Sequence, residues 1–241
     1  MRIDGRKNNQ LRPIRITPHV SEFAEGSAIV EFGKTKVLCT ASLEDMTPKW
    51  LQGTGQGWVT AEYGMLPRST QQRIRRDKSM TGGRTQEISR LIGRSLRAAV
   101  DLKLMSEKSI IVDCDVLHAD GGTRTASVTG GFVALAIAIK KLMDVGEIKT
   151  MPLQHYVSAI SVGLKEPAIL LDLNYEEDSS IGTDMNFVMT SDSRFVEIQG
   201  TAESTPFSRE HLLSMMDVAT EGCKNLFAEQ QKIVGEFYKP C

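Results

Sequence analysis

Two short stretches of the chain combine paired glycines, an arginine and hydroxyl side chains. The first is Gly82-Gly83-Arg84-Thr85, and the second is Gly121-Gly122-Thr123-Arg124-Thr125. Glycine lets the backbone approach a ligand closely, and the arginine fork matches the oxygens of a phosphate group. If each stretch opens a helix, the N–H groups of the first helical turn add further donors. The two stretches together predict that a small anion is bound from two sides.

A third stretch supplies carboxylates. Asp178 and Asp184 lie six residues apart in the segment EEDSSIGTDMN. If Asp178 ends one strand and Asp184 begins the next, both can face one site at the edge of a sheet. Two carboxylates can hold Mg²⁺, which takes one or two protein carboxylates together with waters and substrate phosphates. Taken alone, a solvated acidic hairpin tip would explain the same residues.

The charges along the chain are unevenly distributed, although the net charge is only −1. The segment 68–97 holds nine basic residues against two acidic ones, and the segment 172–203 holds eight acidic residues against one arginine. A basic and an acidic segment in one chain suit a polyanionic substrate and a bound cation. On charge alone, two solvated faces would explain the pattern as well.

The elements that carry these residues follow from hydrophobic periodicity. Gly33-Lys34 should join two strands in a tight hairpin, and residues 52–70 should be irregular because they are rich in glycine. A helix should begin near Thr85, with this threonine as its cap. Residues 109–117 alternate as a half-buried strand, and residues 132–139 are apolar on all sides, as in a buried helix.

The second half of the chain repeats the order of strands followed by a helix. Several strand candidates lie between residues 156 and 200, and an amphipathic helix should run from about Ser208 to Phe237. We therefore predict an α+β protein with two βα lobes packed together, divided into residues 1–150 and 151–241.

Composition narrows the class of protein. Hydrophobic residues make up 41% and charged residues 24%, as in ordinary globular chains. No apolar run approaches the roughly 20 residues that span a bilayer, and the polar beginning of the chain is not a signal peptide. The four cysteines form no C-x-x-C pair, so neither a zinc site nor a disulfide framework is indicated. We expect a cytoplasmic protein with no membrane partner.

Five separated stretches carry a resemblance to a known family. They are GQGWVTAEYGMLPRST, GRTQEISRLIGRSLRA, DCDVLHADGGTRTASVTG, EDSSIGTDMN and VEIQGTAESTPFSR. Together, and in this order, they resemble the bacterial ribonuclease PH family over nearly the whole chain. The resemblance implies a fold like the second domain of a ribosomal small-subunit protein, assembled as a hexameric ring made of a trimer of dimers. The loop QQRIRRDKSMTGG is shorter than is usual in the family.

The resemblance also implies an activity and a set of site residues. The family trims the 3′ ends of tRNA precursors, and of other RNAs such as rRNA, with inorganic phosphate as co-substrate and nucleoside diphosphates as products. By motif, Arg84, Gly122, Thr123 and Arg124 match its phosphate-binding positions. Asp178 and Asp184 match its acidic pair, which binds Mg²⁺ or Mn²⁺ and assists the leaving group, with the role of each aspartate left open.

The basic segment supplies the expected contacts to RNA. They should be electrostatic, salt-dependent contacts to the RNA backbone that do not read its sequence. The side chains expected to make them are Arg68, Arg73, Arg75 and Arg76.

Two other classes of protein fit part of the pattern. A small-molecule phosphotransferase would also use glycine-rich anion turns, but it would depend on ATP and would not need the arginine-rich segment. A non-catalytic ring subunit that binds RNA would lack part of the phosphate or acidic set, whereas this chain has both sets.

Overall fold

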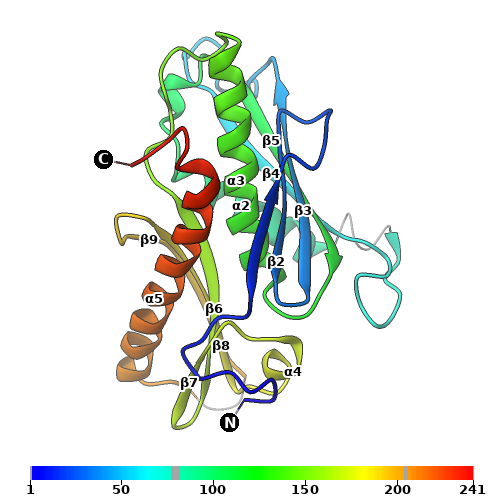
Figure 1. Ribbon diagram of the computed structural model, residues 1–241, viewed down its shortest axis with the longest axis vertical. Coiled ribbons are helices and arrows are strands. Elements are labelled where there is room, and N and C mark those ends of the chain that lie inside the picture. Colours follow the sequence, from blue (N-terminus) through cyan, green and yellow to red (C-terminus); the bar gives the residue numbers. More distant parts are fainter. Residues whose placement is uncertain (1, 77–81, 204–205, 241) are drawn as a thin grey trace.

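The computed structural model describes residues 2–76, 82–203 and 206–240. Two β-sheets with helices packed against them make up the molecule (Figure 1). The first sheet has the order β1-β2-β3-β5-β4, and its strands are antiparallel except for the parallel pair β4 and β5. Its strands are β1 Ile14–Pro18, β2 Gly26–Phe32, β3 Thr35–Glu44, β4 Trp58–Met65 and β5 Ser109–His118.

The second sheet is antiparallel throughout and has the order β7-β6-β8-β9. Its strands are β6 Val157–Lys165, β7 Ala168–Leu171, β8 Thr183–Thr190 and β9 Phe195–Ala202. The first sheet is thus built from residues 14–118 and the second from residues 157–202. This confirms the predicted α+β class with two lobes, while the division at residue 150 stays a prediction.

The helices are α2 Gly83–Arg97, the 3₁₀ helix η1 Leu102–Leu104, α3 Thr123–Asp144, the short α4 Tyr175–Asp178 and α5 Arg209–Val234. Helix α2 packs on β4, and α5 packs on β6 and β7 of the second sheet and on β1 of the first. Helix α3 contacts strands of both sheets (Figure 1). The two lobes therefore share α3 as a common core element.

Helix α3 is the buried helix predicted from residues 132–139. Most of its side chains are buried, including Phe132 and Leu135, which are fully enclosed. By length and hydropathy alone it could cross a membrane, but 83% of its most apolar window is buried inside the molecule. This helix has the burial expected of a core element that lies between two sheets.

Strand β4 corrects one expectation. Residues 52–70 were expected to be irregular, but residues 58–65 form a strand paired in parallel with β5. Val59, Ala61 and Tyr63 alternate inward and are buried, which supplies the apolar face that a strand needs. The positive-φ glycines, Gly53 and Gly55, come before the strand and do not interrupt it.

Strand β5 and the hairpin behave as the sequence predicts. Val112, Cys114 and Val116 are buried on one face of β5, and the hairpin between β2 and β3 turns at Gly33, whose φ is 57°. Strand β5 runs beside β3 and β4 and ends at His118. The second glycine-arginine stretch therefore follows directly from an inner strand of the first sheet.

Candidate active site

The second glycine-arginine turn connects the end of β5 to the beginning of α3. Gly121 has φ 74° and Gly122 has φ 65°, a region that strongly favours glycine. A Cβ atom added at Gly121 would lie 2.5 Å from the carbonyl oxygen of Leu173, which belongs to the second lobe. The turn needs glycine both for its conformation and for its close approach to the other half of the molecule.

Helix α3 begins at this turn, and the amides of its first turn have no partner within the helix. Gly122 is the N-cap residue, and no side chain in the described part of the chain caps the helix. The first intrahelical bond is donated by Ala126 N to Gly122 O at 3.0 Å, so the amides before it lie outside the helical ladder. The first turn of α3 contains no acidic residue. A helix N-terminus of this kind, with Thr123 and Arg124 as its first residues, is suited to bind an anion.

Tyr63 on β4 belongs to this site, although the sequence did not indicate it. Its hydroxyl oxygen lies 2.9 Å from Thr123 Oγ1. Burial raises the pKa of Tyr63, so the phenol stays protonated at neutral pH. The charges of Arg84 and Arg124 act on the pKa of Tyr63 in the opposite direction and lower it. From the sequence alone, Tyr63 could be predicted only as an inward-facing strand residue.

Arg124 is held by side chains from two other elements. Its Nη1 donates to Gln199 Oε1 on β9, and it lies 3.8 Å from Glu87 Oε1 on α2. Gln199 Nε2 in turn donates to the same oxygen of Glu87. Three elements distant in sequence therefore meet at this guanidinium, and no local motif could have indicated Gln199 or Glu87.

The first glycine-arginine turn lies at the beginning of α2. Gly82 is the N-cap residue with an extended backbone, and a glycine has no side chain that could cap the helix, so the prediction that Thr85 is the cap was wrong. The first intrahelical bond joins Gln86 N to Gly82 O at 3.1 Å. Because α2 begins two residues earlier than predicted, Thr85 lies inside its first turn. Arg84 is exposed at the start of the helix.

The acidic pair differs from the predicted hairpin. Asp178 is the last residue of the short helix α4 and does not end a strand. The helix forms here because Asn174 caps it: the Asn174 side chain accepts from Glu177 N, and Glu177 Oε2 accepts from Asn174 N. Asp184 lies on β8, paired with Gly163 on β6 and Thr201 on β9.

The carboxyl group of Asp178 is affected by the charges of several of the predicted residues. Partial desolvation raises the pKa of Asp178, and the neighbouring charge of Asp184 raises it further. Arg124 and Arg84 act on the same carboxyl group in the opposite direction. Arg84, Arg124 and Asp184 therefore all lie within electrostatic reach of Asp178, although the four residues come from four different elements.

The acidic pair fits a magnesium ion by the nature of its donors. No group of three or more histidine, cysteine, aspartate or glutamate side chains that could hold a metal occurs among residues 2–76, 82–203 and 206–240. Mg²⁺ does not require such a cage, because one or two carboxylates together with waters and substrate phosphates are its usual ligands. The mutual repulsion of Asp178 and Asp184 would be relieved by a divalent cation.

The basic segment, residues 68–97, begins shortly after the end of β4 and lies close to the second turn at its start. Ala119 N donates to Ser69 O at 2.8 Å, which ties residues 66–69 to the end of β5. Lys78 of the same segment lies outside the described residues. The arginines predicted to contact RNA are all exposed: Arg68, Arg73, Arg75 and Arg76.

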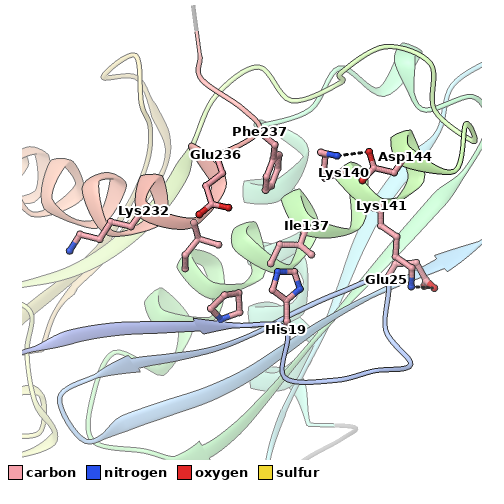
Figure 2. Close-up of a pocket in the computed structure, with 11 residues that line it drawn as sticks. His19, Glu25, Ile137, Lys140, Lys141, Asp144, Lys232, Glu236 and Phe237 are labelled. Carbon is pink, nitrogen blue, oxygen red and sulfur yellow. Dashed lines mark hydrogen bonds and ion pairs between the residues drawn. The ribbon is translucent and has the colours of Figure 1, made fainter.

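A cavity of about 610 Å³ lies away from these residues, between the end of β1 and the C-terminal parts of α3 and α5 (Figure 2). Lys140 and Lys141 line it, but Lys140 pairs with Asp144 and Lys141 lies 3.6 Å from Glu25. Its lining includes none of the predicted site residues. The chemistry-bearing groups gather at the two turns, and we place the candidate active site there.

Comparison with known families agrees with this arrangement. The model of the 3′ exoribonuclease family, domain 1, matches residues 10–141, and the model of domain 2 of that family matches residues 155–222. The chain belongs to the 3′ exoribonuclease family. The ribonuclease PH of Bdellovibrio bacteriovorus is 74% identical over 239 residues, which cover 99% of this chain and 98% of that protein. The predicted family and its exoribonuclease class are thereby confirmed.

Solved structures of more distant proteins share the fold. Rice (Oryza sativa) Rrp46 matches with a TM-score of 0.78 at 21% identity, covering 97% of this chain and 100% of the other. The Archaeoglobus fulgidus exosome with RNA bound to its active site contains a chain that matches with a TM-score of 0.79 at 24% identity, covering 95% and 92%. At these identities the likeness concerns the fold alone.

Proposed function

We propose that this member of the 3′ exoribonuclease family shortens RNA from its 3′ end by phosphorolysis, with tRNA precursors as principal substrates. The reaction is RNA(n+1) + phosphate ⇌ RNA(n) + nucleoside diphosphate. One P–O bond to the departing 3′-oxygen breaks, and one P–O bond to the attacking phosphate forms. Because a phosphodiester is exchanged for a phosphoanhydride, the reaction is reversible and can also add nucleotides to a 3′ end.

The observation that carries this proposal is that the charges of Arg84 and Arg124, one from each turn, both act on the carboxyl group of Asp178. A hydrolase must activate water with a base or a metal hydroxide. A phosphorolytic enzyme starts from a nucleophile that is already an anion, and it must hold that anion beside a negatively charged phosphodiester. Two guanidinium groups and the open helix N-terminus at Gly122 are suited to this positioning and neutralisation.

In this proposal phosphate binds between the two turns. Arg84 approaches it from α2, while Arg124, the Thr123 hydroxyl and the amides of the first turn of α3 approach it from the other side. Tyr63 supports the Thr123 hydroxyl at 2.9 Å. Held in this way, the ion is aligned to attack the terminal phosphodiester in line.

Asp178 and Asp184 would hold the Mg²⁺. When bound, the ion offsets negative charge on the transferring phosphoryl group. Asp184 is half-buried on β8, and we assign it the second task of assisting protonation of the departing 3′-oxygen. The exposed Asp178 at the end of α4 then serves mainly to bind the metal.

Contacts to the RNA come from the exposed arginines of the basic segment. Arg68 lies among the residues 66–69 that are tied to the end of β5, and Arg73 follows four residues after them, so an RNA backbone bound there would lead toward the second turn. These contacts carry no base readout. A hexameric ring, a trimer of dimers, would add steric exclusion of the folded acceptor stem and so favour tRNA ends. The cytoplasmic location stays a prediction.

The proposed function is tested by identifying the products. A 3′-extended tRNA is incubated with the protein and Mg²⁺, with and without inorganic phosphate. We expect nucleoside diphosphates that appear only when phosphate is present. Nucleoside monophosphates, or an equal rate without phosphate, would contradict phosphorolysis.

Paired arginine variants test the site. Arg124→Ala should reduce kcat/KM for phosphate by about 10²-fold or more, the usual cost of removing one donor from a developing negative charge. The binding of RNA, measured by fluorescence anisotropy, should change little. Arg94→Ala is the control, because Arg94 is an exposed side chain on α2 that pairs with Glu197 at 2.8 Å. Loss of RNA binding with unchanged phosphate use in Arg124→Ala would reverse the assignment.

A further inference from the structure

The backbone of the second turn is held from outside the site by two residues. Arg12 Nη1 donates to the carbonyl oxygen of Asp120, and both terminal nitrogens of Arg12 lie within 3.5 Å of Gly121 O. Thr35 Oγ1 donates to Gly121 O at 2.7 Å and accepts from Asp120 N at 2.9 Å. The two residues that precede Gly122 are thus fixed by side chains from before β1 and from the beginning of β3.

The same guanidinium group also grips the second lobe. Arg12 Nε donates to Asp172 Oδ2 at 3.0 Å, and Arg12 Nη2 donates to Asp172 Oδ1 at 2.6 Å. The backbone N–H of Arg12 donates to Asp172 Oδ2 at 2.8 Å. Asp172 is fully buried and Arg12 is nearly so, with 4% of its side chain exposed. A single planar fork therefore joins the two halves of the molecule at the turn.

Asp172 is itself locked in place immediately before the acidic helix. Its φ is 57°, an uncommon value for a residue other than glycine, and its N–H donates to Ser161 O at 2.7 Å. The next residue, Leu173, donates to Ser161 Oγ at 3.0 Å, and Asn174 then caps α4. Only five residues separate the carboxylate that Arg12 grips from Asp178, and the backbone between them is fixed.

The acidic helix has a second attachment to the beginning of the chain. Arg2 Nε donates to Glu177 Oε1 at 2.7 Å, and Arg2 Nη1 donates to Leu171 O at 2.6 Å. Arg6 adds a bond from Nη1 to Asp172 O at 3.0 Å. Residues 2–12 therefore form a strap that binds α4 through Arg2 and binds the turn through Arg12.

We propose that Arg12, assisted by Thr35, is a positioning residue that holds the phosphate-binding turn and the acidic helix α4 in one fixed relation. This inference rests on the proposed site. In this role Arg12 does not need to contact phosphate or RNA. It acts through the carbonyl groups of the turn and through Asp172, and so sets where the amides of α3 and the carboxylate of Asp178 lie.

Arg12→Lys tests this role, because a lysine keeps the charge beside Asp172 but cannot reach the turn and the carboxylate with one planar fork. We expect a folded protein whose KM for phosphate rises about tenfold or more and whose kcat falls, since small misplacements of reacting groups are costly. The phosphate concentration that raises the melting temperature half-maximally should rise by the same factor. The KM for RNA should change by no more than about twofold.

Arg15→Lys is the matched control. Arg15 lies on β1, its side chain is 77% exposed, and its ion pair with Glu31 is long at 4.0 Å. This variant should keep the wild-type constants for phosphate and RNA. If Arg12→Lys lowers only the melting temperature and leaves both phosphate readouts at the wild-type value, Arg12 is merely structural and the proposal is wrong.

Thr35→Val provides a second route if Arg12→Lys does not fold. It removes both side-chain hydrogen bonds to the turn, nearly preserves volume and leaves the buried charges untouched. It should raise the KM for phosphate severalfold, and an unchanged value would overturn the proposal. Arg124→Ala is measured in parallel. If Arg124→Ala also leaves phosphate use unchanged, the site assignment fails. If only Arg124→Ala has an effect, the positioning role alone fails.

Discussion

The two glycine-arginine turns look alike in sequence but are built differently. The turn at Gly121-Gly122 has positive φ values, faces the second lobe and is gripped by buried side chains. The turn at Gly82-Gly83 has an extended N-cap residue, and a Cβ atom added at Gly83 would meet nothing within 4 Å. One turn is fixed by the rest of the fold, and the other projects from the start of a helix.

This difference suggests a division of labour. The fixed turn carries Arg124, whose guanidinium group is held by Gln199 and Glu87. A preorganised group needs no rearrangement when negative charge develops beside it. The open turn carries the exposed Arg84, which can adjust its long side chain to the arriving ion. We interpret the fixed turn as the preorganised part of the phosphate site and Arg84 of the open turn as its exposed second contact.

Alanine substitutions at the two turns should give the largest contrast. Gly121→Ala forces a Cβ atom to within 2.5 Å of Leu173 O at a φ of 74°, so we expect a loss of stability of about 2–4 kcal/mol and loss of activity. Gly83→Ala lies at the first position of α2 in open space, and it should stabilise the protein by about 0.5–1 kcal/mol. Urea unfolding measures both changes. Equal effects of the two substitutions would show that the turns are not built differently.

Loss of the negative charge of Asp178, by protonation or by substitution, should lower activity and raise the stability of the metal-free protein. The pKa of Asp178 is raised, so the folded state binds this proton more readily than the unfolded state does. The stability of the metal-free protein should therefore gain from this group as pH falls through the raised pKa, and Mg²⁺ binding should weaken over the same range. Asp178→Asn should abolish activity and slightly raise the melting temperature at pH 7 without metal.

Asp192→Asn is the control, because the pKa of Asp192 is shifted in the opposite direction to that of Asp178. Hydrogen bonds from Thr190 and Arg194 lower the pKa of Asp192 to about 2. Its stabilising contribution is present above the unfolded pKa and is lost as pH falls through the folded value, so Asp192→Asn should lower the melting temperature at pH 7 and leave activity unchanged. A fall in melting temperature for both variants at pH 7 would contradict the assigned repulsion at Asp178.

A smaller effect is expected at the support of the fixed turn. Tyr63→Phe removes one hydrogen bond to Thr123 Oγ1, and the KM for phosphate should rise about three- to tenfold. Tyr156→Phe is the matched control, because Tyr156 donates a buried hydrogen bond to Tyr238 O at 2.9 Å, distant from the site in the fold. Steady-state phosphorolysis at varied phosphate measures both. A change in the Tyr156 variant alone would remove Tyr63 from the site.

The local hydrophobic pattern of the sequence could predict most helices and strands, but not the long-range contacts that join them. Alternation placed Cys114 and Val116 on the inner face of β5, and all-round apolarity identified the core of α3. Residues 58–65 were missed because the glycines before them dominated the pattern, whereas pairing with β5 decides the structure. The helix that ends at Asp178 was missed because the apolar run before it favoured a strand that continues to Asp178. The capping box at Asn174 begins a helix there instead.

The candidate site could be predicted only where a motif carried it. The arginines, glycines and aspartates lie in recognisable stretches, and the fold brings them together. Tyr63, Gln199 and Arg12 act on that site through contacts that span between 60 and 160 residues of sequence. Such long-range contacts depend on how two sheets pack against α3, and no local spacing encodes them.

The central claim is that both turns hold one phosphate ion. It is tested most directly by a double-mutant cycle on phosphate affinity, in which Arg84→Ala, Arg124→Ala and the double variant are compared with the wild-type protein by phosphate-dependent thermal shift. We predict that each single variant weakens binding and that the double variant deviates from the sum by more than about 0.5 kcal/mol, because contacts to one ion are coupled. Additive effects within that limit, or no effect of one arginine, would contradict a shared ion.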